Sequence, residues 1–501
     1  MIKDPRFLLL YPRNQTIKGY MCKPNGSLAY PNIGGALLSR GVQVSVFDAC
    51  VGNEKDDLQE VFYRSTELPS GLLRTGVSDE RIVEEASAAD VVGLTSIFTS
   101  QERMVLDAAQ LIKAHSPEKL IVAGGVNARH RLLQFLTGGV DLVFLSEAEL
   151  SVIQLAGALR RGEDWRSIAG IAFLDNGNVI VNPVTPETLV TDLDALPLPA
   201  WHLLPNDRYW MIGRPHGGHF EPGTPLRYAS MMTSMGCVFS CAYCHISREK
   251  DGEVSGNIGR FRIKSDQRVA EELRVLKGLG VKQVFVEDDT LFGMKRRGVE
   301  LLRKIRGHGL EVLDVNGVNV THLFRNTGGG TFAPDEDVIE ALVEAGFREV
   351  VLGFESGSPR IVRKYASNKW PVRALDIGQL LKALKARGLT VSGNYMLGYP
   401  DETREEIERT IAMAARHRAL GLDWANFLCV MPLPGTLIFE WAIRDGHLPA
   451  DFNPDLMNWT LATMTNTPVP AEEIERRRFE AWTQLNDAAM VAQRNAMNVT
   501  L

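Results

Sequence analysis

The chain has 501 residues, 45% of them hydrophobic and 23% charged, and a formal net charge of −6. This length and composition predict a globular protein of two to four domains. They argue against an extended nucleic-acid surface, because no long basic run is present, and leave only a local basic groove as the alternative. No apolar run reaches the roughly 18 residues of a membrane span, and the N-terminus lacks the apolar core of a signal peptide. We therefore expect a cytoplasmic protein with neither a nucleic acid nor a membrane as partner.

Residues 1–160 alternate apolar, strand-like runs with helical segments. The predicted strands are Phe7–Tyr11, Val42–Asp48, Val91–Ser96, Leu120–Gly125 and Leu142–Leu145. The predicted helices between them are Pro31–Arg40, Ile82–Ala89 and Met104–His115. This alternation predicts an α/β, Rossmann-like, doubly wound parallel sheet. Ligands of such sheets bind at the carboxyl ends of the strands.

The predicted carboxyl ends carry small, hydroxylated and acidic residues, which let the edge of a large ligand approach the backbone. The candidates are Thr95, Ser96, Gly124, Gly125, Asn127 and Glu147. No G-x-G-x-x-G motif follows the first strand, so the pattern does not favour a dinucleotide. A Rossmann-like domain without a ligand is the alternative.

Residues 161–224 are predicted to form a linker that contains a β-hairpin. Ala169–Leu174 and Val179–Val181 flank Asp175–Asn178, where an Asn-Gly pair favours a tight turn. The prolines of Leu193–Trp201 then favour extended chain.

Three cysteines in the loop Thr233–His245 stand at C-x₃-C-x₂-C spacing: Cys237, Cys241 and Cys244. Thiolates so close in sequence can ligate three irons of one cubane cluster. The fourth iron then stays open to a small molecule, as the open position of a catalytic metal site does. A zinc site is the alternative, but structural zinc takes four ligands, and His245 directly follows Cys244. Such a cluster implies a reducing compartment.

Residues 225–450 again alternate strands and helices, and six such units predict a partial (β/α)6 barrel. The predicted strands are Tyr228–Met232, Gln283–Asp289, Val312–Asn316, Glu349–Gly357, Thr390–Pro400 and Trp424–Val430. The cysteine loop follows the first strand, so it lies on the face where barrels carry their chemistry. Residues 451–501 are predicted to be a small C-terminal segment in which Ala471–Met497 is one long helix.

These motifs together resemble the cobalamin-binding radical S-adenosylmethionine (SAM) enzymes, a group that includes the class B radical SAM methyltransferases. The cysteine motif with Tyr243 before its last cysteine carries the resemblance. It extends to four strand-end segments: Glu287–Asp289, Gly353–Gly357, Gly398–Thr403 and Pro432–Thr436. The N-terminal sheet resembles the family's cobalamin-binding domain, and the order of the two domains is preserved over residues 1–450. The cobalt-ligating motif D-x-H-x-x-G is replaced by Asp48–Asn53, which has no histidine.

The resemblance implies three cofactors: a [4Fe–4S] cluster, SAM and cobalamin. It implies that Cys237, Cys241 and Cys244 ligate the cluster and that SAM chelates the open iron. Tyr243 would pack on the adenine. The other candidate SAM-binding residues are Glu287, Asp288, Glu355, Ser356 and Asn394. The six strand-end residues of the first sheet would contact cobalamin.

By the same resemblance, the reduced cluster releases a 5′-deoxyadenosyl radical from SAM, and cobalamin carries a methyl group to the substrate radical. We therefore expect methylation of an unactivated carbon, or of a phosphinate phosphorus, in a small-molecule biosynthetic intermediate. Flavodoxin or ferredoxin would donate the electron. A cobalamin-dependent radical SAM cyclase or rearrangement enzyme without methyl transfer is the first alternative. Methylthiolation of RNA or protein is disfavoured, because only two cysteines precede the loop. A non-catalytic cobalamin or redox sensor is a third alternative.

Overall fold

The structure is a computed structural model that describes residues 4–20, 22–24, 26–213, 226–250, 252, 255–371, 374–489 and 491–492. The chain forms two compact units. The first contains residues 4–213 together with 249–258, and the second contains residues 226–248 and 259–492. The predicted boundary at residues 224 and 225 lies outside the described residues. No helix within the described ranges is long and apolar enough to cross a membrane.

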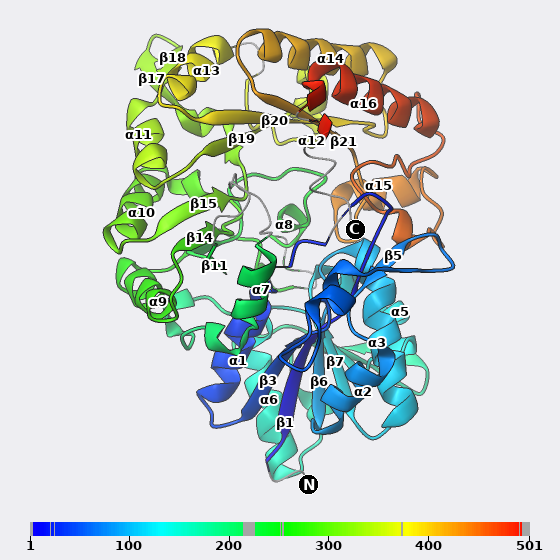
Figure 1. Ribbon diagram of the computed structural model, residues 1–501. Coiled ribbons are helices and arrows are strands. Elements are labelled where there is room, and N and C mark those ends of the chain that lie inside the picture. Colours follow the sequence, from blue (N-terminus) through cyan, green and yellow to red (C-terminus); the bar gives the residue numbers. More distant parts are fainter. Residues whose placement is uncertain are drawn as a thin grey trace. The chain divides into compact units, whose positions relative to one another are not determined.

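A seven-stranded sheet forms the centre of the first unit (Figure 1). Five parallel strands come first, and an antiparallel pair closes one edge. In spatial order the strands are β3 (Gln43–Asp48), β1 (Arg6–Tyr11), β6 (Val91–Thr95), β7 (Leu120–Gly124), β8 (Leu142–Phe144), β9 (Ile171–Asp175) and β10 (Asn178–Val181). The predicted doubly wound parallel sheet is thus confirmed.

Helices cover both faces of this sheet (Figure 1). Helices α1 (Ala29–Leu38) and α6 (Ala148–Arg161) bury Leu37 and Leu155 against the strands, in one apolar core with Phe7, Val91 and Phe144. The remaining helices of the unit are α2 (Asp79–Ser87), α3 (Glu102–His115), α4 (Val126–His130), α5 (Leu132–Thr137) and α7 (Asn206–Ile212). A small antiparallel sheet, which the sequence did not predict, joins β2 (Asn14–Thr16), β5 (Leu73–Thr75) and β4 (Thr66–Glu67).

The hairpin that the sequence places in a linker is part of the first sheet. Strand β9 pairs antiparallel with β8, and Phe173 packs into the main core. Asn176 and Gly177 both have positive φ, as the Asn-Gly turn requires. The turn was therefore predicted, but the partner strand was not, because turn chemistry does not specify which sheet a hairpin joins.

The second unit is the predicted partial barrel, built from two sheets of parallel strands (Figure 1). The first sheet holds β11 (Tyr228–Met231), β14 (Gln283–Val286) and β15 (Glu311–Val315). The second holds β16 (Val318–Asn319), β19 (Glu349–Glu355), β20 (Thr390–Leu397) and β21 (Trp424–Cys429). Only two residues separate β15 from β16, and Gly317 there has a φ of 72°. The predicted strand Val312–Asn316 thus corresponds to β15, whereas β16, which begins the second sheet, was not predicted.

Helices pack around the outside of these strands (Figure 1). They are α9 (Asp266–Gly278), α10 (Lys295–Gly307), α11 (Glu336–Glu344), α13 (Ile377–Lys385), α14 (Arg404–Ala419) and α16 (Ala471–Leu485). Two further helices, α12 (Pro359–Tyr365) and α15 (Leu437–Arg444), pack in one apolar core with Ala242. Several begin at a side chain that caps the first turn. Thr403 and Glu406 form a capping box, and Ser265 accepts a hydrogen bond from the backbone of Arg268.

Three features of this unit differ from the prediction. Helix α12 was not predicted. The hairpin of β17 (Phe324–Gly328) and β18 (Thr331–Pro334), which turns at the glycines 328–330, was not predicted either. Helix α16 ends at Leu485, well before Met497. It ends there because the amide of Asn486 exchanges two hydrogen bonds with the backbone of Ala425 on the edge strand β21.

Candidate functional site

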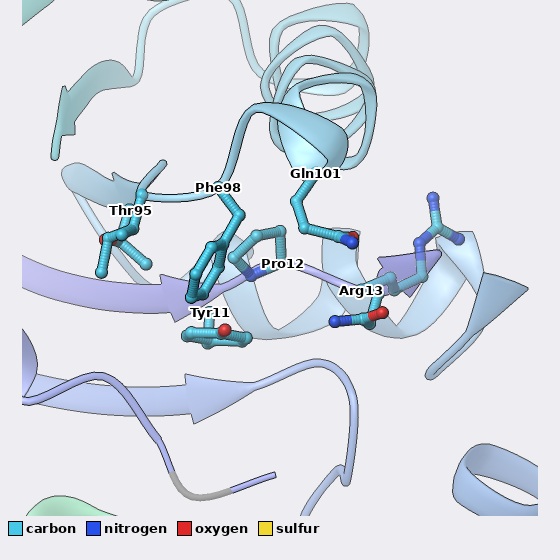
Figure 2. A pocket seen from close by; sticks show the side chains of 8 residues that line it. Tyr11, Pro12, Arg13, Thr95, Phe98 and Gln101 are labelled. Carbon is cyan, nitrogen blue, oxygen red and sulfur yellow. The ribbon is translucent and has the colours of Figure 1, made fainter. Parts of the chain in front are cut away.

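The first candidate site lies at the carboxyl edge of the N-terminal sheet, where β1 and β6 lie side by side. After β1 the chain continues to β3 on one side of this pair, and after β6 it continues to β7 on the other side. Open α/β sheets bind ligands at such a point, where the strand order reverses. Ile97 and Phe98 follow β6 with 41% and 55% of their surface exposed. A hollow opens at this edge (Figure 2), lined by Tyr11, Pro12, Arg13, Asn14, Thr95, Ile97, Phe98 and Gln101. Exposed apolar side chains beside a hollow suit the face of a large, flat ligand.

Of the six predicted cobalamin-binding residues, only Thr95 lines this hollow. Ser96 and Asn127 are buried, and the Nδ2 of Asn127 donates to the Oγ of Ser96 at 3.0 Å and to Glu102 Oε2 at 3.1 Å. These two residues therefore brace the loops after β6 and β7 against each other. Glu147 is half-buried and directly precedes α6.

Gly124, the last residue of β7, and Gly125, which follows it, differ in the space and backbone conformation that they require. Gly125 has φ 100° and ψ 160°, a conformation that is essentially restricted to glycine. A Cβ there would also overlap the carbonyl oxygen of Ser96. Gly124 has no heavy atom within 4 Å of an added Cβ. Gly125 is thus required by the backbone, whereas Gly124 leaves open space that a ligand can approach.

Replacing Gly125 with alanine is expected to lower the free energy of unfolding by about 1–3 kcal/mol, the usual range for such backbone strain. Gly124→Ala is the matched control and is expected to change stability by less than about 0.5 kcal/mol. Urea unfolding of the two variants and the wild type measures both values. Equal stabilities of the two variants would contradict the prediction.

Cys50 stands where the cobalt-ligating motif of the family has its histidine. Only 1% of its surface is exposed, and its thiol donates to the carbonyl oxygen of Pro12 at 3.3 Å. The neighbouring Asp48 accepts from the Tyr209 hydroxyl at 2.7 Å, and burial raises the pKa of Asp48 to about 6. Cys50 therefore occupies a packed interior position, as a small buried residue does.

The second candidate site is the cysteine loop at the carboxyl end of β11. Gly236 has a φ of 79°, and a Cβ there would overlap the backbone of Arg260. Its amide donates to Asp289 Oδ2 at 2.8 Å. Further along the loop, Ala242 donates to the carbonyl oxygen of Tyr365 and accepts from the amide of Ile438. Hydrogen bonds made by the loop's own backbone therefore hold it both near its start, at Gly236, and near its end, at Ala242.

Asp288, predicted to bind SAM, lies beneath this loop with only 1% of its surface exposed. Oδ1 accepts from the amide of Thr233 at 2.6 Å. Oδ2 accepts from the hydroxyls of Thr233 and Ser234, at 2.6 and 2.5 Å. Both carboxylate oxygens are thus used within the protein. Glu287 is half-buried, and Ser230 Oγ donates to it at 3.1 Å.

The three cysteines lie close enough to influence one another's ionisation. Burial raises the pKa of Cys244 to about 12, and the charges of Cys241 and Cys237 add to the shift. Burial also raises the pKa of Cys241, while the Lys369 ammonium opposes the shift. Within the described ranges, no three His, Cys, Asp or Glu side chains are arranged around a single metal ion. In a cubane cluster, three deprotonated cysteines each bind a different iron. The Lys369 ammonium beside Cys241 favours the deprotonated thiol, so these residues fit such a cluster.

Glu355 and Lys369 form a buried ion pair in the barrel, next to these thiols. Lys369 Nζ lies 2.5 Å from Glu355 Oε1, and their side chains are 15% and 8% exposed. The pair lies over Gly353, where an added Cβ would be 2.9 Å from Glu355 Oε1 and 3.6 Å from Lys369 Nζ. Gly353 is level with Asn394 on the neighbouring strand β20. The absence of a side chain at 353 therefore makes room for the pair.

Two other predicted SAM-binding residues lie in the same part of the barrel. Asn394 Oδ1 accepts from Asn426 at 2.9 Å, so its Nδ2 is the group left to donate to a ligand. Lys369 Nζ lies 5.9 Å from the centre of the Tyr243 ring. The buried Tyr243 hydroxyl lies beside the sulfur of Cys241 and meets no stronger partner among the described residues. Tyr243, Glu355 and Asn394 thus lie in the same part of the second unit as Lys369, and their role in SAM binding stays a prediction.

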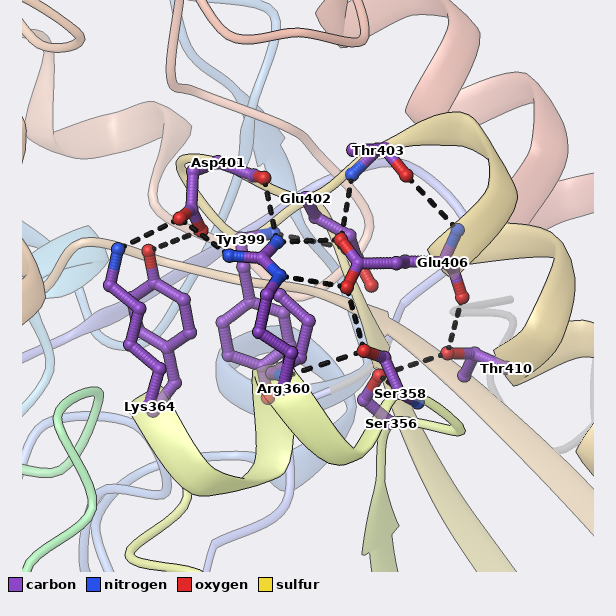
Figure 3. Close-up of polar contacts among 12 residues, drawn as sticks. Ser356, Ser358, Arg360, Lys364, Tyr399, Asp401, Glu402, Thr403, Glu406 and Thr410 are labelled. Carbon is purple, nitrogen blue, oxygen red and sulfur yellow. Dashed lines mark hydrogen bonds and ion pairs between the residues drawn. The ribbon is translucent and has the colours of Figure 1, made fainter.

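Ser356 belongs instead to a polar network that joins α12 to the start of α14 (Figure 3). Its hydroxyl is fully buried, lies 3.1 Å from that of Thr410, and accepts from the amide of Ser358. Arg360 pairs with Glu406 in the same network. These contacts indicate that Ser356 holds the strand end in place rather than contacting a ligand.

Two residues near the cysteine loop were missed by the sequence analysis: Lys369 and His322. The His322 ring lies 5.7 Å from that of Phe239 in the loop, and burial lowers the pKa of His322 to about 4. Neither residue lies in a motif or at a predicted strand end. A lone lysine or histidine in a connecting segment carries no sequence signal, so only the tertiary structure could reveal them.

Comparisons with known proteins agree with this fold and site. The model of the radical SAM superfamily matches residues 231–414. A Pyrococcus horikoshii protein described as an uncharacterized methyltransferase is 32% identical over 373 residues, which are 74% of this chain and 72% of that protein. The cytidylyl-2-hydroxyethylphosphonate methyltransferase of Streptomyces wedmorensis is 26% identical over 88% of this chain and 82% of its own length.

The fold is also that of the radical SAM methyltransferase TsrM from Kitasatospora setae. Its structure with cobalamin and a [4Fe–4S] cluster bound matches 97% of this chain and 92% of its own, with a TM-score of 0.63 and 16% identity. The two units and the cysteine loop therefore define a radical SAM enzyme with the fold of the cobalamin-dependent members. The chain belongs to the same family as the Pyrococcus methyltransferase.

Proposed function

We propose that this protein is a cobalamin-dependent radical SAM methyltransferase that acts on a small-molecule biosynthetic intermediate. The observation that carries the proposal is the three-cysteine loop at the carboxyl end of β11, beside the buried Glu355–Lys369 pair. Family membership with a protein described as an uncharacterized methyltransferase supports the reaction class. Similarity to a methyltransferase of a phosphonate compound supports a small-molecule substrate.

The residues take the following roles in this proposal. Cys237, Cys241 and Cys244 hold the cluster, while Asp288 and Asp289 fix their loop. Tyr243, Glu287, Glu355 and Asn394 contact SAM, and Ser356 positions the end of β19. Thr95 and the open space at Gly124 receive cobalamin, with Glu147 at the same edge, and Ser96, Gly125 and Asn127 shape the loops. When bound, these cofactors supply radical generation and a transferable methyl group, and the protein orients them and excludes water.

The acceptor atom in this proposal is an unactivated carbon or a phosphinate phosphorus, and reduced flavodoxin or ferredoxin supplies the electron. The test is anaerobic turnover with methyl-labelled SAM, followed by analysis of the product. We expect one label per product and formation of 5′-deoxyadenosine. Formation of 5′-deoxyadenosine and an unlabelled, altered product would contradict methyl transfer and favour a cyclase or rearrangement enzyme. No cleavage of SAM by the cluster-loaded protein would favour a sensor.

A further inference from the structure

The segment that carries Lys369 has an unusual backbone. Ser367 and Asn368 have φ of 55° and 48°, and Glu355 at the end of β19 has a φ of 60°. Residues other than glycine rarely adopt this left-handed conformation, and each costs free energy that the surrounding structure must offset. Three such residues therefore occur on the two segments that bring Glu355 and Lys369 together. Strain concentrated in this way is typical of functional sites.

Several contacts hold the strained segment in place. Ser367 Oγ accepts from the amide of Ser240 in the cysteine loop at 3.1 Å. The carbonyl oxygen of Lys369 accepts from Thr321 Oγ1 at 3.3 Å, and Trp370 Nε1 donates to the carbonyl oxygen of Phe354 at 2.8 Å. The segment is thus bonded to the cysteine loop on one side and to the strand bearing Glu355 on the other. These anchors fix where the Lys369 ammonium lies.

The charges around Lys369 are unevenly matched. Lys369 Nζ lies 5.9 Å from the centre of the Tyr243 ring, and Tyr243 directly precedes Cys244 in the cysteine loop. Among the described residues, the ion pair of Lys369 is with Glu355 Oε1. The positive charge is therefore balanced by Glu355 as long as the carboxylate has no other partner. A hydroxyl that donates to Glu355 does not change the net charge of the pair, but it competes with Lys369 for the carboxylate and weakens the screening of the ammonium. The ammonium then acts more strongly on the cysteines.

We propose that Lys369 is a positioning residue that couples SAM binding to reduction of the cluster. A ribose hydroxyl of SAM donates to Glu355, and the Lys369 charge then acts on the cluster more strongly and raises its reduction potential. In the step itself, one electron from reduced flavodoxin or ferredoxin enters the oxidised cluster, and no bond or proton changes place. Charged groups near a cluster are among the factors that set its potential, and a positive charge that is less well screened favours the reduced cluster. This inference rests on the proposed function and on the assignment of Glu355 to SAM.

The test is an anaerobic redox titration of the cluster-loaded full chain, followed by electron paramagnetic resonance, with and without SAM. At a fixed potential, Lys369→Gln is expected to lower the ratio of reduced to oxidised cluster roughly tenfold, about 59 mV for one electron. Lys369→Arg keeps the charge and is expected to retain the wild-type potential. Glu355→Gln leaves Lys369 unbalanced and is expected to raise the potential. SAM is expected to raise the potential of the wild type but not of Glu355→Gln.

The control is Lys385→Gln, which removes an exposed lysine that is ion-paired with Asp423. It is expected to leave the potential unchanged. Equal potentials in wild type, Lys369→Gln and Glu355→Gln would overturn the inference. If Lys369→Gln does not retain its cluster, Glu355→Gln alone decides. An unchanged potential in Glu355→Gln would overturn the inference, and a raised potential would support it. A wild type that binds no cluster would instead contradict the proposed function.

Discussion

Replacing Cys237, Cys241 or Cys244 individually with alanine is expected to remove most of the bound iron and to abolish SAM cleavage. A cubane held by three thiolates keeps only two when one is lost. Iron and sulfide analysis after anaerobic reconstitution gives the first measurement. The amount of 5′-deoxyadenosine formed with dithionite gives the second, and we expect it to fall below detection.

Cys429→Ala is the matched control for these variants. Cys429 is also a free, buried cysteine of the second unit, but it lies within strand β21. Its loss is expected to leave the iron content unchanged and to affect stability only modestly. If Cys429→Ala loses as much iron as the loop variants, general destabilisation explains the effect, and the cysteine loop is not the cluster site.

Replacing Asp288 with asparagine is expected to lower the iron content several-fold before any SAM is added. Three groups donate hydrogen bonds to the two carboxylate oxygens of Asp288. In the asparagine variant, one of these oxygens becomes an NH₂ group, which cannot accept a hydrogen bond from the same donors. A buried polar group left unsatisfied costs about 1–3 kcal/mol, and here the cost falls on the start of the cysteine loop. Iron analysis and urea unfolding measure the two effects. Losses in both iron content and stability would identify Asp288 as a residue that supports the loop.

Glu287→Gln separates this role from cofactor binding, since Glu287 is adjacent in sequence but half-buried. We expect it to keep its iron and to bind SAM more weakly, as measured by equilibrium dialysis. If Asp288→Asn retains full iron and loses only SAM affinity, Asp288 is a SAM ligand, and the support role is wrong.

Most strands were predictable because buried parallel strands are continuous apolar runs. Phe7–Tyr11 and Val91–Ser96 match β1 and β6 to within one residue at each end. Elements that depend on distant partners were not predictable. The C-terminal helix stops at Leu485 because Asn486 bonds to Ala425, which is 61 residues away in sequence. Likewise, β9 joins the first sheet through pairing with β8, a contact that local propensity does not encode.

The sequence by itself determined the chemistry of the cysteine loop and the α/β class of both units. Both follow from local patterns: thiol spacing within eight residues, and apolar runs of strand length. The roles of individual polar residues were decided only by tertiary structure. Asp288 and Ser356 bear groups that could serve a ligand, yet both are buried and engaged within the protein. Lys369 comes from a segment without a motif, and its position depends on backbone strain and contacts with three separate segments.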